Sequence, residues 1–332
     1  MSTPYEHIPV LYEQALEALS PRAGVAYIDA TVGAGGHAAG ILQRSAPDGR
    51  LLGLDRDPQA LEAAGQRLSP FAGRFLLLHA DYASLAEQAR RHGFLGAAGV
   101  LFDLGVSSGQ LDRPERGFSF QVDAPLDMRF DPNEGPSAAD LLNALGEEEL
   151  ADILWRYGEE RLARRIARRI VQARQRAPLR RTTELARLVA EVAGRHGRIH
   201  PATRTFQALR IAVNRELERL PLGLQQAVEV LAPGGRLVVI AFHSLEDRLV
   251  KEFIRREEGI CDWPARVPAA ACPHFLADGP APRSCRAQAG AGCSRPARLR
   301  ALGRVVRPEE TEVASNPRAR SARMRLAERL GA

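Results

Sequence analysis

Short apolar runs alternate with amphipathic stretches over roughly the first hundred residues. Four runs have the length of a strand, and a stretch of helical periodicity separates each from the next; they cover residues 25–29, 50–55, 75–79 and 100–104. A fifth run, 236–242, follows the turn Pro233-Gly234-Gly235. Strands that alternate with helices are typical of βαβ units, which build a parallel sheet. The pattern therefore predicts an α/β fold with a Rossmann-like sheet.

The spacing of these runs also predicts an inserted domain. About 130 residues separate the fourth run from the fifth, whereas a crossover helix needs only about 10–15 residues. We therefore expect a main domain made of 1–110 and 216–332, interrupted by an insert of 111–215.

The insert has the periodicity of helices. Helices are predicted over 138–145, 161–176 and 184–193. Ser137 is placed to cap the first of them, and either Thr182 or Thr183 is placed to cap the third. One apolar stripe marks the buried face of the second helix and consists of Leu162, Ile166 and Ile170.

Charge is concentrated in this insert. The chain has a net charge of +6, and Lys251 is the only lysine among its 46 basic residues. From 155 to 215 there are 16 arginines and four glutamates, a local balance of +12. This density fits a surface that neutralises the phosphates of a nucleic acid, and a solvated helix face is the alternative. The candidate RNA contacts on the second helix are Arg164, Arg165 and Arg168.

The N-terminal stretch and the length of the apolar runs bear on the expected location of the protein. Glu6, Glu13 and Glu17 interrupt the N-terminal stretch, which lacks the apolar run of a secretory signal. No stretch approaches the ~20 apolar residues of a membrane span. We expect a cytoplasmic protein with no membrane partner.

After Lys251 a loop rich in Pro, Ala, Gly and Arg is expected up to about residue 299, and two short strands, 299–307 and 322–327, are expected to follow. All four cysteines lie in or next to this loop: Cys261, Cys272, Cys285 and Cys293. Spacers of 10, 12 and 7 residues separate them. Structural zinc sites favour pairs only two to four residues apart, so no metal site is predicted.

A glycine-rich turn follows the first predicted strand, in the string Asp29-Ala-Thr-Val-Gly33-Ala-Gly35-Gly36-His37. Glycines let the backbone approach a ligand closely, and the next helix presents its N–H groups there. Gly33, Gly35 and Ala38 also fit the G-x-G-x-x-A form of the dinucleotide-binding pattern. A nicotinamide-dependent oxidoreductase is therefore an alternative function.

Polar residues follow the other strands. Asp55 ends the second strand, where a carboxylate can accept hydrogen bonds from the ribose hydroxyls of an adenosine cofactor; Asp57 suits a helix cap better. Tyr82, after the third strand, could flank an adenine or be an ordinary loop aromatic. Asp103 and Gln110 bound a stretch of small polar residues after the fourth strand, at the edge where open α/β sheets bind ligands.

Ten strings between His7 and about Glu328 carry a specific resemblance. They are His7-Ile-Pro-Val-Leu11, Asp29-Ala-Thr-Val-Gly-Ala-Gly-Gly-His37, Leu54-Asp-Arg-Asp-Pro58, Asp103-Leu-Gly-Val-Ser-Ser108, Glu115-Arg-Gly-Phe-Ser-Phe120, Pro125-Leu-Asp-Met-Arg129, Tyr157-Gly-Glu-Glu160, His200-Pro-Ala-Thr-Arg-Thr-Phe-Gln207, Phe242-His-Ser-Leu-Glu-Asp-Arg248 and Asn316-Pro-Arg-Ala-Arg-Ser-Ala322. In these strings the chain resembles the RsmH (MraW) family, the 16S ribosomal RNA cytosine-N4 methyltransferases.

The resemblance implies a class I methyltransferase sheet with S-adenosyl-L-methionine as cofactor. The implied cofactor site consists of Gly33, Gly35, Gly36, His37, Asp55, Tyr82, Asp103 and Gln110. It also implies N4-methylation of a specific cytidine in the decoding region, at the P site, of 16S rRNA within the 30S ribosomal subunit. Arg204 joins the candidate RNA contacts. The chain departs from the family at Tyr82, where Phe is familiar, and in its looser cysteine spacing. The oligomeric state is left open, with a homodimer among the alternatives.

The chemistry expected of such an enzyme assigns further residues. Cytosine N4 is a poor nucleophile because its lone pair is delocalised, so Asp103 and a neighbouring backbone carbonyl are candidates to accept hydrogen bonds from the amine. His243 could contact the base or relay the released proton, or could be a structural histidine. An unpaired or extruded cytosine needs stacking partners, for which the candidates, or else core residues, are Phe118, Phe120 and Phe206. A non-catalytic RNA-binding protein is the third alternative.

Overall fold

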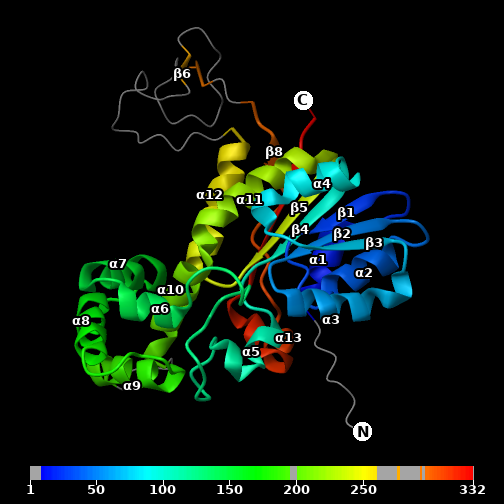
Figure 1. The fold of residues 1–332 in the computed structure, drawn as a ribbon. Coiled ribbons are helices and arrows are strands. Elements are labelled where there is room, and N and C mark those ends of the chain that lie inside the picture. Colours follow the sequence, from blue (N-terminus) through cyan, green and yellow to red (C-terminus); the bar gives the residue numbers. More distant parts are fainter. Residues whose placement is uncertain (1–8, 195–199, 260–274, 277–291, 294–295, 332) are drawn as a thin grey trace. The chain divides into compact units, whose positions relative to one another are not determined.

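The computed structural model describes residues 9–194, 200–259, 275–276, 292–293 and 296–331. The chain divides into two compact units, whose elements are labelled in Figure 1. The first unit consists of Met1–Asp55, Leu61–Gly105 and Leu220–Ala332, and the second of Arg56–Ala60 and Val106–Arg219. The chain thus leaves the first unit after strand β4 and returns to it within helix α11.

The first unit contains a sheet of seven strands in the order β3-β2-β1-β4-β5-β9-β8. The strands are β1 (Ala26–Asp29), β2 (Arg50–Asp55), β3 (Phe75–His79), β4 (Ala97–Asp103), β5 (Leu231–Ala241), β8 (Leu299–Ala301) and β9 (Arg323–Arg329). Strands β1 to β5 are parallel, and β9 and β8 add antiparallel pairs at one edge. The strand order reverses between β1 and β4, which is where ligands bind in open α/β sheets. The predicted α/β, Rossmann-like class is confirmed.

Helices cover both faces of this sheet (Figure 1). They are α1 (Tyr12–Leu19), α2 (Gly36–Arg44), α3 (Pro58–Leu68), α4 (Leu85–His92), α11 (Glu216–Val230) and α12 (Ser244–Glu257). The short helix α13 (Glu310–Ser315) belongs to the same unit and buries none of its residues. Helices α1, α2 and α3 contribute to one hydrophobic core, and α4, α11 and α12 contribute to the other. Among the described residues no helix is both long and apolar enough to span a membrane.

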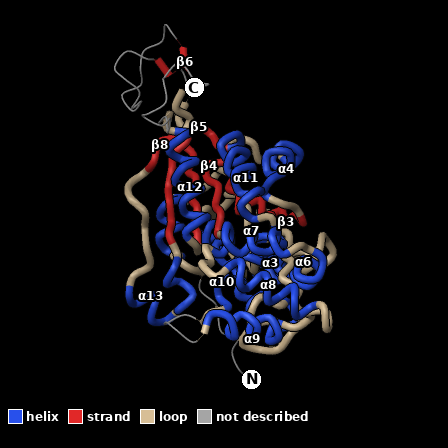
Figure 2. The backbone as a smooth tube through the Cα atoms, turned by 90° about the vertical axis from the view of Figure 1, so that its left-hand side faces the viewer, coloured by secondary structure: helices blue, strands red, loops and turns tan. Residues whose placement is uncertain are grey.

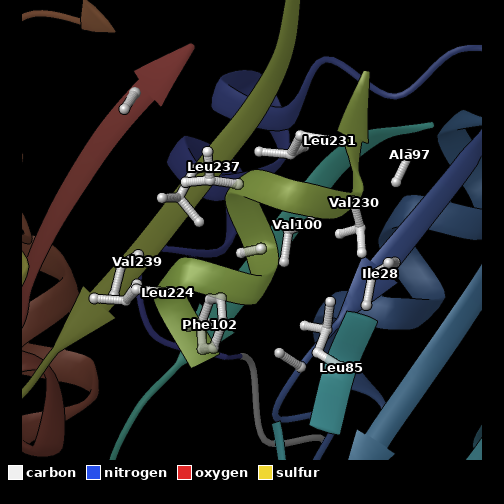
Figure 3. Packing of buried hydrophobic residues seen from close by; sticks show 14 of the residues in the cluster. Ile28, Leu85, Ala97, Val100, Phe102, Leu224, Val230, Leu231, Leu237 and Val239 are labelled. Atoms are coloured by element: carbon white, nitrogen blue, oxygen red, sulfur yellow. The ribbon is translucent and has the colours of Figure 1, made fainter. Parts of the chain in front are cut away.

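Successive side chains of the central strands enter the two different cores. In β1, Tyr27 belongs to the core of α1 and α2, while Ile28 belongs to the core of α4 and α11. Leu101 and Phe102 of β4 divide in the same way. Figure 3 shows the second core, in which Ile28 and Phe102 gather with Leu224 of α11. Burial on both faces explains why these strands have nearly continuous apolar sequences.

Two of the predicted strands, 50–55 and 75–79, have the predicted bounds. Strand β4 begins three residues before the expected 100. Strand β5 begins at Leu231 rather than 236, so the Pro233-Gly234-Gly235 turn lies within it. The pairing explains the difference: Leu231 pairs with Ala97 and Arg236 pairs with Gly99, with a register shift between them that takes up the turn.

The C-terminal part differs more from expectation. Helix α12 continues to Glu257, where a loop was predicted from 252, because Phe253 and Ile254 are buried in the sheet core. The predicted strand 299–307 is limited to β8, followed by one isolated bridge at Val306. Two short strands, β6 (Phe275–Leu276) and β7 (Gly292–Cys293), pair with each other. The expectations for Cys261, Cys272 and Cys285 lie outside the described residues.

The second unit is built from helices and connecting loops (Figure 2). They are α5 (Ser108–Leu111), α6 (Ala138–Ala144), α7 (Glu147–Gly158), α8 (Ala163–Arg174), α9 (Thr182–Ala193) and α10 (Ala202–Asn214). The expected stripe of α8 is confirmed, since Ile166 and Ile170 are buried in the core of this unit, together with Leu150 and Leu185 of neighbouring helices.

Of the two predicted helix caps, the one at α6 is confirmed and the one at α9 is wrong. Ser137 caps α6, because its Oγ accepts the Asp140 N–H and the Asp140 carboxylate accepts the Ser137 N–H. Helix α9 instead contains Thr182 as its first residue. The Thr182 hydroxyl accepts the Ala124 N–H and donates to the Val122 carbonyl, so it holds a neighbouring loop rather than the helix end.

Candidate functional site

Three parallel strands end in a carboxylate at the same edge of the sheet. Asp29, Asp55 and Asp103 are the last residues of β1, β2 and β4, and β1 lies between the other two strands. Sequence reasoning singled out Asp55 and Asp103 but treated Asp29 only as part of the glycine string. Its position at the end of the central strand was the signal that could have identified it.

Hydrogen bonds join the glycine turn after β1 to the neighbouring strand β2. The Gly33 N–H donates to Asp55 Oδ2 at 2.8 Å, and the Val32 N–H donates to the Leu54 carbonyl at 2.9 Å. Gly33 and Gly35 have φ values of 51° and 79°, in the left-handed region that side chains disfavour. A Cβ at Gly36 would lie 2.4 Å from Pro9 Cγ. The turn therefore has to present bare backbone at the start of α2.

His37 and Asp103 lie together beside this turn. His37 is buried and its ring stacks on Tyr12, with centroids 5.9 Å apart. Its Nε2 is 3.5 Å from Asp103 Oδ2. The Asp103 N–H donates to Thr31 Oγ1 at 2.7 Å, which ties the end of β4 to the turn.

Polar atoms at this edge lack hydrogen-bond partners. In the described part of the chain, neither ring nitrogen of His37 nor Asp103 Oδ1 has one, although all three atoms are buried. Buried polar atoms are nearly always satisfied by protein, water or ligand. An adenosine-containing methyl donor with an amino group fits these residues, because bare backbone, the Asp55 carboxylate and these atoms offer it hydrogen bonds.

Asp29 is the most deeply buried group of the cluster. Its carboxyl is 1% exposed and its Oδ1 accepts the Thr31 N–H at 3.2 Å. Burial raises the pKa of Asp29 to about 7, against the opposing effect of His37, and the charges of Asp103 and Asp55 act in the same direction as burial. A pKa of about 7 leaves Asp29 about half protonated near neutral pH, which limits the negative charge at this edge.

Tyr82 follows β3 in the short 3-10 helix Tyr82–Ser84. Its ring meets Phe102 edge to face, with centroids 5.7 Å apart. A Cβ at Gly223 of α11 would lie 2.5 Å from Tyr82 Cδ2, so that glycine makes room for the ring. Tyr82 thus packs against the sheet core, and its contact with an adenine stays a prediction.

Gln110 belongs to a buried network in the second unit. Its Nε2 donates to Asp57 Oδ2 at 2.9 Å, and its Oε1 accepts the Ser107 N–H at 3.0 Å. Arg116 Nη1 donates to the same Asp57 oxygen at 2.8 Å. Asp57 Oδ1 also accepts the Gln59 N–H, as expected for a helix cap. This network holds the start of α5, and the role of Gln110 toward a cofactor stays a prediction.

His243 lies at the N-terminus of α12 and is engaged there. Its Nδ1 accepts the Glu246 N–H at 3.3 Å, and its Nε2 is 3.0 Å from Glu246 Oε1. Glu246 Oε2 in turn accepts the Phe242 N–H at 2.9 Å. In the described part of the chain His243 Nε2 is buried and forms no hydrogen bond, so the role of His243, structural or catalytic, stays a prediction.

The predicted RNA-contacting arginines differ in how they are paired. Arg164 and Arg165 on α8 are exposed, and neither has a carboxylate partner among the described residues. Arg168 is also exposed, but its Nε is 3.2 Å from Glu147 Oε1. Arg204 is exposed on α10 with its Nη1 3.5 Å from the Glu159 carbonyl oxygen.

Replacing Asp29 with asparagine should change the pH dependence of stability. The folded protein raises the Asp29 pKa from 3.8 to about 7, so between these values it binds more protons than the unfolded chain and loses stability as the pH rises. Asn cannot titrate. The free energy of unfolding is measured in urea at about pH 5 and about pH 8 for both proteins. The difference between Asp29→Asn and wild type should shift in favour of the variant by about 2 kcal/mol at the higher pH. Parallel pH profiles of the two proteins would contradict this assignment.

Comparison with known proteins gives a whole-chain match. The model of the MraW methylase family matches residues 4–330. A protein of Thermomicrobium roseum named ribosomal RNA small subunit methyltransferase H is 53% identical over 98% of this chain and 94% of its own length. A protein of the same name from Dehalococcoides mccartyi is 47% identical over 99% of this chain and 88% of its own length.

Among solved structures, a precorrin-6y C5,15-methyltransferase from Geobacter metallireducens is similar with a TM-score of 0.40 at 10% identity. That match covers 100% of this chain and 94% of the other.

Proposed function

Because this chain belongs to the MraW methylase family, we propose that it transfers a methyl group from S-adenosylmethionine to N4 of a cytidine in 16S rRNA. The observation that supports a methyl-donor site most directly is the group of buried, unpartnered atoms of His37 and Asp103 beside the glycine turn. The similar proteins named for methylation of small-subunit ribosomal RNA support the substrate.

The family membership confirms the expected methyltransferase and its cofactor, S-adenosylmethionine, and the nicotinamide-dependent alternative is wrong. Methylation of small-subunit ribosomal RNA follows from the names of the relatives. Three finer parts of the proposal rest on the ten sequence strings alone. They are the choice of N4 of cytidine, the position in the decoding-region P site, and the assembled 30S subunit as the substrate.

We assign the donor to the carboxyl edge of the first unit. The backbone of Gly33, Gly35 and Gly36 would lie against it, and Asp55 would accept hydrogen bonds from its ribose. His37 and the Oδ2 side of Asp103 would contact its methionine part, where a carboxylate suits an ammonium group, and Oδ1 of Asp103 is left for the amine of the RNA. When bound, S-adenosylmethionine supplies an activated methyl group on a positively charged sulfur.

Asp103 has the geometry to act on an amine. Its Oδ2 is turned toward His37, while its Oδ1 is unpartnered. An N4 hydrogen donated to Oδ1 would draw the amine lone pair out of conjugation and toward the methyl donor. After transfer the amine carries one proton too many, and that proton leaves to Asp103 or to water. In-line placement of the amine and the methyl group would accordingly supply much of the rate.

The test of this function is the product. Small ribosomal subunits from a strain that lacks the enzyme are incubated with methyl-labelled S-adenosylmethionine, and mass spectrometry locates the label in 16S rRNA. The proposal predicts a single labelled N4-methylcytidine in the decoding region. Naked 16S rRNA in a parallel reaction reports whether the assembled subunit is required. Label at another atom or nucleotide, or no transfer to either substrate, would refute the assignment.

Replacing Asp103 with asparagine should lower the rate of methyl transfer about 100-fold or more, because the amide cannot accept the proton and binds an ammonium poorly. Arg90→Gln, at an exposed position on α4, is the matched control and should keep the wild-type rate. Circular dichroism verifies that both variants fold. An Asp103→Asn enzyme as fast as the control would remove Asp103 from the mechanism.

Replacing the unpaired arginines Arg164 and Arg165 together with glutamine should weaken RNA binding and leave S-adenosylmethionine affinity intact. Two lost phosphate contacts should reduce the slope of log affinity against log salt by about 1.5–2. Arg169→Gln removes a charge whose Nη2 is already paired with Glu191 at 2.7 Å, so it should change the slope less. Adding Arg168→Gln should weaken binding further. Unchanged RNA affinity in the triple variant would exclude this helix face.

A further inference from the structure

Three aromatic rings in contact extend from the core of the second unit toward its surface. Phe206 on α10 is 5% exposed and belongs to the hydrophobic core of this unit. Phe120 meets Phe206 edge to face, with centroids 5.0 Å apart. The imidazole of His200 stacks on Phe120 with centroids 4.5 Å apart and an interplanar angle of 28°. Phe120 is half-buried and His200 is exposed.

The exposed ring of His200 is held in place. Its Nδ1 accepts the Ala202 N–H at 3.1 Å, and its carbonyl accepts the Thr203 N–H at 3.0 Å. Phe120 covers one face of the imidazole, and His200 as a whole is exposed. A ring already fixed in one orientation loses little conformational entropy when a planar ligand stacks on it.

A cation lies four residues further along the chain, on the first turn of α10. Arg204 is exposed, and its side chain forms no ion pair with a carboxylate in the described part of the molecule. Among the described residues its side chain has a single hydrogen bond, to the Glu159 carbonyl at 3.5 Å, which is long and leaves the guanidinium charge without a carboxylate partner there. An exposed aromatic residue and a guanidinium without a carboxylate partner, four residues apart, have the chemistry that single-stranded nucleic acid requires, one group for a base and one for a phosphate.

We infer that His200 is a base-stacking platform for single-stranded RNA, supported from below by Phe120 and Phe206 and accompanied by Arg204. The inference rests on the proposed function, since it places an unpaired nucleotide of the RNA substrate on the second unit. It assigns no sequence preference, because every base has a face that can stack. The occupied Nδ1 leaves Nε2 as the donor of the neutral imidazole.

Two substitutions separate stacking from helix capping. His200→Phe keeps a ring on Phe120 but loses the acceptor for the Ala202 N–H. His200→Asn keeps a short acceptor but loses the ring. Each full-length variant is titrated with a fluorescently labelled, unstructured RNA of about ten nucleotides. A second titration uses an abasic strand with the same number of phosphates.

Stacking predicts that His200→Phe binds the RNA as wild type does, whereas His200→Asn binds it about tenfold more weakly. The abasic strand should bind all three proteins equally. Arg204→Gln should weaken both probes and lower the salt slope by about 1. Circular dichroism, measured for each variant, verifies that it folds.

Equal RNA affinity of wild type and His200→Asn would overturn the inference. So would the reverse order, with His200→Phe weak and His200→Asn strong, since capping alone gives that result. Methyl transfer by the wild-type protein to small subunits is measured alongside. Absence of transfer counts against the proposed function only, whereas the order of RNA affinities decides the role of His200.

Discussion

The site depends on carboxylates placed where parallel strands end, one of them buried and two partly buried. Three such strands converge on one edge and bring Asp29, Asp55 and Asp103 together, and buried charges are costly unless they are neutralised or hydrogen-bonded. The Gly33 N–H satisfies Asp55, and a raised pKa allows Asp29 to stay neutral. Asp103 and His37 retain unpartnered atoms. The same packing that builds the sheet therefore leaves an edge that a polar, cationic ligand completes.

The two units carry different parts of the chemistry. The first unit holds the strand ends and the glycine turn, whereas the second carries exposed guanidinium groups and the ring stack of His200. Within the second unit many arginines are already used in structure: Arg116 is buried against Asp57, and Arg169 pairs with Glu191. The local excess of positive charge thus overstates the number of free cations, and pairing decides which arginines remain for phosphates.

Sequence patterns predicted the features that depend on local order. The strand of 50–55 was found to its bounds because two-sided burial demands an unbroken apolar run, and Ser137 because its capping box is local. Features set by distant partners were missed. Thr182 bonds to residues about 60 positions away, and the start of β5 depends on pairing with β4. The burial of Asp29 depends on packing that only the assembled sheet provides.

The most direct measurement is a crystal structure of the protein grown with S-adenosylmethionine. We predict that the backbone of the Gly33 to Gly36 turn contacts the donor, that its ribose hydroxyls are within hydrogen-bond distance of Asp55, and that its methionine part lies beside His37 and Asp103 Oδ2. A donor bound elsewhere, with the ring nitrogens of His37 still unpartnered, would contradict the central claim that this edge is built to hold it.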